Sequence, residues 1–155
     1  MKRVKSKLIL KTFDGTMKKL NINPKFKDSK IEFHIKYYNE EDILTKALIV
    51  FKGVIAIDFE INYFDNYIGS ELQGFYEIFD TTAKIKMVEK IFNNRLKGVL
   101  YHGDYNYDLT EQNDWLNYRE NLDKVVKEID KYKLYQQQTE GGIFYILGLN
   151  YEVCI

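Results

Sequence analysis

Apolar and polar positions along the chain change their pattern most clearly within residues 45–64. From Ala47 to Phe51 the residues are apolar without interruption, which is typical of a strand covered on both faces of a sheet. We therefore expect a central strand here. From Val54 to Tyr63 apolar and polar residues alternate, which predicts a strand with one buried and one mostly polar face. Gly53 between them predicts a hairpin turn, or else a bulge in one long bent strand.

Alternation, apolar runs and turn residues predict further strands on both sides of this stretch. The turn dipeptide Asp14-Gly15 predicts a hairpin between residues 7–13 and 17–22, and Asn23-Pro24 ends the second strand. Residues 71–79 fit a helix or a strand, and we favour the strand. The other predicted strands are residues 31–38, 99–102, 133–138, 143–147, the last two joined by a turn at 139–142, and the chain end through Val153, Cys154 and Ile155.

Two segments have helical spacing instead. The first begins at the capping oxygens of residues 80–82 and runs to about Leu96, with apolar residues every three or four positions. The second is capped by Thr110 and reaches about Tyr132. These elements predict an α+β fold: a mainly antiparallel sheet of about six to eight strands with two helices packed on it. Residues 1–155 are expected to form a single domain.

Charge is balanced overall but uneven along the chain. Lysine and arginine together number 23, as do aspartate and glutamate together. The chain therefore has no net positive charge to attract nucleic acid, and we do not predict nucleic acid as a partner. Residues 1–30 nevertheless carry ten basic residues against Asp14 and Asp28. We interpret these lysines as a guard on exposed sheet edges, with a phosphate-facing surface as the alternative.

The sequence offers little catalytic chemistry. Cys154 is the single cysteine, which predicts a reducing compartment and a buried thiol in the apolar chain end. His102-Gly103-Asp104, with Asp108 nearby, is the only candidate metal or ligand site, and a solvated loop is the simpler interpretation. We expect no cofactor and no metal. The sequence shows no signal segment and no membrane span, so we expect a cytoplasmic protein that does not enter a membrane.

Tyrosines beside acidic or amide residues form the strongest binding signal. They occur in two predicted loops, and tyrosine combines a large contact area with a hydrogen-bonding tip. The acidic neighbours argue against stacking on single-stranded nucleic acid. We therefore predict a protein partner and assign its binding to Tyr63, Asp65, Asn66, Tyr67, Asp104, Tyr105, Tyr107 and Asp108.

The run Val50-Phe51-Lys52-Gly53-Val54, followed by an alternating strand and Asn66-Tyr67-Ile68, resembles a pattern in small immunity proteins of bacterial polymorphic toxin systems. The resemblance implies a cytoplasmic α+β protein that neutralises a cognate toxin by tight binding and has no catalytic residues. The alternatives are a phage-encoded inhibitor of a host defence protein and a small-ligand or metal-dependent enzyme with a site near His102. A homo-oligomeric subunit is a further alternative.

Overall fold

The computed structural model describes residues 5–23, 25, 28–62, 64, 70–102 and 119–155, and their side chains except at 70–71 and 95–102. The chain divides into two compact units, residues 1–80 with 132–155 and residues 81–131. Each unit is described by itself, so the expectations of a single domain and of helices packed on a sheet stay predictions.

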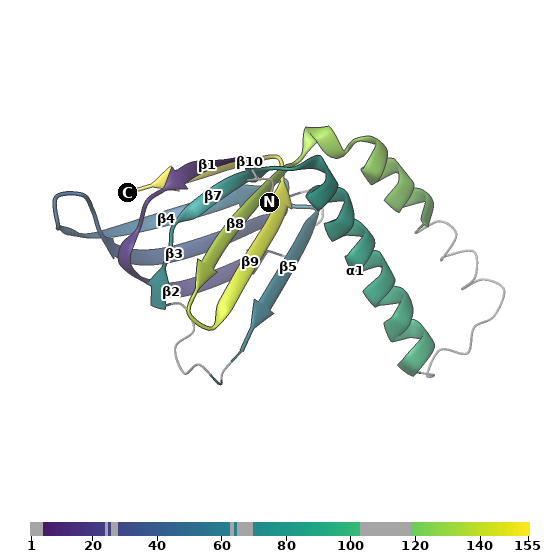
Figure 1. Cartoon of the computed structure of the whole chain (residues 1–155), viewed down its shortest axis with the longest axis horizontal. Coiled ribbons are helices and arrows are strands. Elements are labelled where there is room, and N and C mark those ends of the chain that lie inside the picture. Colours follow the sequence, from purple (N-terminus) through teal and green to yellow (C-terminus); the bar gives the residue numbers. More distant parts are fainter. Residues whose placement is uncertain (1–4, 24, 26–27, 63, 65–69, 103–118) are drawn as a thin grey trace. The chain divides into compact units, whose positions relative to one another are not determined.

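The first unit contains two five-stranded antiparallel sheets, whose strands cross in front of one another in Figure 1. Sheet A has the order β1 (Lys5–Leu10), β7 (Phe75–Phe79), β8 (Lys133–Thr139), β9 (Gly142–Gly148) and β5 (Ala56–Ile61). Sheet B has the order β10 (Asn150–Cys154), β4 (Leu44–Lys52), β3 (Lys30–Tyr38), β2 (Phe13–Asn23) and β6 (Ser70–Leu72). The α+β class and the antiparallel pairing are confirmed. The described residues form ten strands in two sheets, however, where six to eight in one sheet were expected.

One aromatic cluster joins the two sheets. The ring of Phe33 in β3 lies 5.9 Å from that of Phe51 in the same sheet. It also lies 5.3 Å from Phe75 and 5.6 Å from Phe144, which belong to sheet A. All three contacts are edge-to-face, the geometry that aromatic quadrupoles favour. The inward residues predicted for β3, which are Ile31, Phe33, Ile35 and Tyr37, are all buried, so the alternation placed this strand correctly.

The hairpins predicted at Asp14-Gly15 and at Gly53 are both wrong, because β1 and β2, and likewise β4 and β5, lie in different sheets. The connections are only two or three residues long, and such corners are typical of strands that switch between packed sheets. At the second corner Gly53 has a φ of 61°, and a Cβ built there would lie 2.6 Å from Leu149. Asp14-Gly15 lies inside β2, where the register with β3 shifts, instead of closing a turn.

Four other predictions fall within the described residues. The strand chosen for residues 71–79 is confirmed, but Gly74, with a φ of 107°, divides it between β6 and β7. The β8–β9 hairpin and the C-terminal strand are confirmed. Cys154 is exposed and not buried, because the alternation of β10 turns Tyr151 and Val153 inward and Cys154 outward.

The second unit is helical. Helix α1 spans Thr81–His102. Of the residues predicted to face the core, Met87, Val88 and Phe92 are buried, whereas Ala83 and Ile91 are half-buried. The strand predicted for residues 99–102 is wrong, because the helix continues through Gly98, whose propensity cost of about 1 kcal/mol does not end it. Residues 119–127 are also helical and lead into a 3-10 turn at Ile129–Lys131. The predicted start of this helix at Thr110 lies outside the described residues.

Candidate functional site

Strand β5 is an outer edge of sheet A. It pairs with β9 in a register without shifts, from Ala56 opposite Leu147 to Ile61 opposite Gly142. Ile57 and Phe59 pack against the core, and the Phe59 ring lies 4.8 Å from that of Phe144. These two side chains attach β5 to the core of the first unit. No strand of the described chain pairs with the other side of β5.

The hydrogen bonds of β5 indicate which backbone groups point outward. The N–H of Asn62 donates to the Gly141 carbonyl at 2.9 Å, in continuation of the β5–β9 register. Antiparallel pairs alternate between hydrogen-bonded and non-hydrogen-bonded residues. The N–H and C=O groups of Ile57, Phe59 and Ile61 therefore point away from β9. They offer a second strand a row of donors and acceptors.

Strand β1 forms the opposite edge of the same sheet and has a different character. It carries Lys5 and Lys7, and its register with β7 shifts between Leu8 and Leu10. Charged lysines and bulges both discourage edge-to-edge pairing. The expectation that N-terminal lysines guard a sheet edge thus agrees with the position of β1.

The predicted partner-binding residues lie outside the described residues. Asn62 and Phe64, the neighbours of the first group, are described, and the Phe64 side chain is 82% exposed. In sequence this group directly follows β5. His102 is the last residue of α1, but its side chain is not described. The residues outside the description are Tyr63, Asp65, Asn66, Tyr67, Asp104, Tyr105, Tyr107 and Asp108, so their roles stay predictions.

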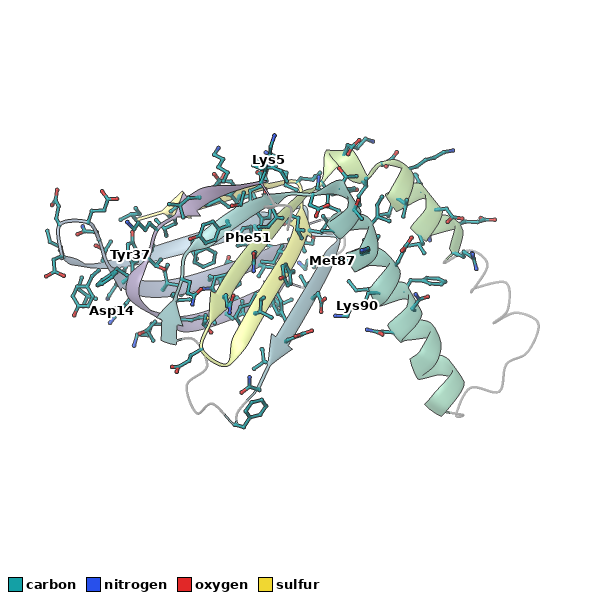
Figure 2. All side chains as sticks on the ribbon, in the orientation of Figure 1. Lys5, Asp14, Tyr37, Phe51, Met87 and Lys90 are labelled. Carbon is teal, nitrogen blue, oxygen red and sulfur yellow. The ribbon has the colours of Figure 1, made fainter. Side chains whose placement is uncertain are left out.

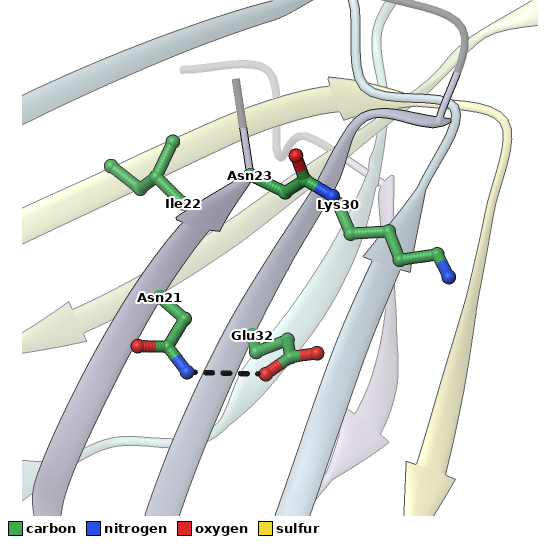
Figure 3. A pocket seen from close by; sticks show the side chains of 5 residues that line it. All are labelled: Asn21, Ile22, Asn23, Lys30 and Glu32. Atoms are coloured by element: carbon green, nitrogen blue, oxygen red, sulfur yellow. Dashed lines mark hydrogen bonds between the residues drawn. The ribbon is translucent and has the colours of Figure 1, made fainter. Parts of the chain in front are cut away.

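A shallow hollow of about 300 Å³ lies on sheet B (Figure 3). The Asn21 amide donates to the Glu32 carboxylate at 3.3 Å, and His34 Nε2 lies 3.4 Å from the same oxygen. These two contacts hold the pKa of Glu32 below its usual range. A carboxylate whose pKa is lowered is a poorer general acid at neutral pH. The residues that line the hollow are Asn21, Ile22, Asn23, Lys30 and Glu32.

Neither a cluster of metal-binding side chains nor a membrane-spanning helix occurs in the described part of the chain. No group of three or more histidine, cysteine, aspartate or glutamate side chains there is placed to hold a metal ion. The helical segments that are described include none with the length and apolarity needed to cross a membrane.

Sequence reasoning missed a second exposed surface, at the end of sheet B. Phe13 lies opposite Tyr38, and Tyr38 lies opposite Leu44, so that three apolar residues stand side by side on β2, β3 and β4. All three are exposed. Alternation alone did not identify them, because Phe13 and Leu44 become neighbours of Tyr38 only through the pairing of the strands.

Comparisons with protein-family models, with curated proteins and with solved structures find no match for this chain.

Proposed function

We propose that this is a non-enzymatic, cytoplasmic binding protein that inhibits a partner protein, as toxin-immunity proteins do, and that β5 receives a strand of that partner. The observation that carries the proposal is the regular edge of β5, with outward backbone groups at Ile57, Phe59 and Ile61. Strand addition of this kind gains affinity from main-chain hydrogen bonds and specificity from alternate side chains. The edge leads directly into residues 63–67, where the sequence predicts partner binding.

The charge of the edge favours a partner strand with basic residues. Asp58 and Glu60 lie on one face of β5, and residues 54–64 contain no lysine or arginine. Opposite charges directly across a strand pair stabilise it, whereas like charges destabilise it. A partner strand with lysine or arginine at alternate positions would therefore meet opposite charges on this edge, in addition to the interactions that Asp58 and Glu60 already make within the chain.

The same charges disfavour pairing of β5 with a second copy of itself. In an antiparallel self-pair that keeps side chains on matching faces, Asp58 meets Asp58 or Glu60, or Glu60 meets Glu60. Each arrangement places like charges opposite each other. The edge thus discriminates between a copy of the chain and a basic partner, which supports recognition of a different protein.

A phage-encoded inhibitor of a host defence protein is the alternative within the same class of function. It would use the same edge, and only the identity of the partner separates it from an immunity protein. No described residue favours the third expectation, an enzyme with a site near His102.

The test combines capture and reconstitution. Tagged wild-type protein, the edge variant Asp58→Lys/Glu60→Lys and the control Lys5→Glu/Lys7→Glu on β1 are used to capture proteins from lysate of the native host. We expect one stoichiometric partner with the wild type and the control, but not with the β5 variant. The purified partner should bind 1:1 in calorimetry and lose its own activity when bound. Thermal melts of the three proteins show whether the variants are folded.

Equal binding of the partner by the folded β5 variant would contradict the strand-addition mode. A partner that binds 1:1 but keeps its activity would contradict the inhibitory function.

A further inference from the structure

We infer that a second copy of this chain covers the exposed end of sheet B. This surface consists of an apolar row, Phe13, Tyr38 and Leu44, whose side chains are 61%, 38% and 56% exposed. Residues directly opposite in an antiparallel sheet share a face, so the row is contiguous across β2, β3 and β4. Contiguous apolar surface of this kind in a soluble protein commonly marks an interaction site.

Two lysines lie on one side of the apolar row. Lys36 in β3 is directly opposite Lys46 in β4, two residues along each strand from Tyr38 and Leu44. Like charges directly opposite each other destabilise a sheet. Neither lysine makes an ion pair within the described residues. The pair therefore costs the isolated chain stability, and an acidic group from outside would offset that cost.

Acidic residues lie on the other side of the row, in the turn that joins β3 to β4. Glu40, Glu41 and Asp42 are all exposed and form no ion pair with the described part of the chain. The turn is ordered by its own hydrogen bonds, because Asn39 Oδ1 accepts from the N–H groups of Glu41 and Ile43, each at 3.0 Å. Figure 2 shows carboxylate-bearing side chains at this end of the ribbon, near the labelled Asp14. The backbone that carries these acidic residues is thus ordered beyond the apolar row.

The character of the surface therefore changes along the strand direction, from the acidic turn through the apolar row to the lysine pair. Two residues of a strand span roughly 7 Å, so the lysine pair lies about that far from the apolar row. A two-fold axis along the row places Phe13, Tyr38 and Leu44 of one copy over the same residues of the other. It also places each acidic turn over the lysine pair of the partner copy. Such an isologous interface satisfies both charged groups at once.

A copy of this chain fits better than the other classes of occupant. Nucleic acid and anionic membranes would gain from Lys36 and Lys46 but would be repelled by the acidic turn. An unrelated protein would need the same three-part pattern in the reverse order, whereas a second copy supplies it by symmetry. This surface belongs to sheet B, so the inference is independent of the partner proposed for β5 of sheet A.

Sedimentation equilibrium of the full chain and of two charge variants tests the inference. Lys36→Glu/Lys46→Glu makes the surface acidic at both sides, and Glu40→Lys/Glu41→Lys makes it basic at both sides. We expect the wild type to dimerise, each variant alone to dimerise at least about tenfold more weakly, and an equimolar mixture of the two variants to regain the affinity. Lys124→Glu/Lys127→Glu, on the exposed side of the helix at residues 119–127, is the matched control and should dimerise as the wild type does.

Three results would overturn the inference. The first is a wild-type protein that stays monomeric at millimolar concentration, and the second is a dimer that neither variant weakens. The third is a pair of monomeric variants that do not associate when mixed, since the charge complementarity would then have no role. Tyr38→Ser/Leu44→Ser offers a check that does not alter charge, and it should also favour the monomer.

Discussion

The two edge strands of sheet A, β1 and β5, both have backbone groups on their outer side, but they differ in charge and in regularity. Strand β1 carries Lys5 and Lys7 and is interrupted by a shift of register. Strand β5 is regular, contains no lysine and presents Asp58 and Glu60. The first arrangement discourages strands generally, whereas the second discourages a copy of the chain and still accepts a basic strand. From this difference we propose that β5 is an edge for recognition of a partner strand and that β1 is an edge protected from pairing.

The largest effect is expected from a substitution in the aromatic core, which contacts the strands next to both edges, β7 and β9. Phe33 is fully buried and its ring contacts Phe75 and Phe144 of sheet A. Phe33→Ala should lower the free energy of unfolding by ~3–5 kcal/mol, because it deletes buried surface and leaves a cavity. Urea denaturation measures this loss. A loss below 1 kcal/mol, on the order of an exposed substitution, would mean that the two sheets do not depend on this contact.

The next largest effect is expected at the outward N–H groups of β5. Ile61→Pro removes one outward donor, while Ile61→Thr keeps the donor and changes the side chain. Because a lost backbone hydrogen bond costs about 1 kcal/mol or more, the proline variant should bind the purified partner at least about fivefold more weakly than the threonine variant. Calorimetry measures both affinities. Equal affinities would place the partner elsewhere on the protein.

A smaller effect is expected from removing the guards of both edges. Lys5→Val/Lys7→Val should increase association of β1 edges, and Asp58→Asn/Glu60→Asn should increase self-pairing of β5, because each pair of charges then stops repelling its own copy. Light scattering as a function of concentration measures association. If neither variant associates more than the wild type, these charges do not protect the edges.

The smallest effect is expected at Glu32, a carboxylate away from both edges. Hydrogen bonds from Asn21 and His34 lower the pKa of Glu32. These contacts therefore stabilise the fold at pH values above the ordinary pKa of glutamate. Their contribution is lost as the pH falls through the lowered pKa. Asn21→Ala should raise this pKa toward its usual value and slightly lower stability at neutral pH. An NMR titration of the Glu32 carboxyl measures the change. An unaltered pKa would show that the amide at 3.3 Å contributes nothing.

The sequence predicted strands better than it predicted sheets. Alternation identified the buried face of β3, because a period of two residues reports directly which side chains face the core, and the turn residues at 139–142 identified the β8–β9 hairpin. It could not show that β4 and β5 lie in different sheets, because a glycine such as Gly53 is compatible both with a hairpin turn and with a connection between two sheets. β5 is an edge strand because it lies in a different sheet from β4, and this depends on contacts between residues far apart in the sequence. The loops that the sequence assigned to partner binding lie outside the described residues, so the candidate site was predicted only as far as the alternating strand that precedes them.

Amide hydrogen exchange along β5 of the free protein tests the central claim most directly, because it requires no partner. An open edge predicts fast exchange at Ile57, Phe59 and Ile61, whose N–H groups point outward, and slow exchange at Asp58 and Glu60, whose N–H groups face β9. Protection of all five amides alike would mean that the edge is already covered, and would contradict β5 as the site of strand addition.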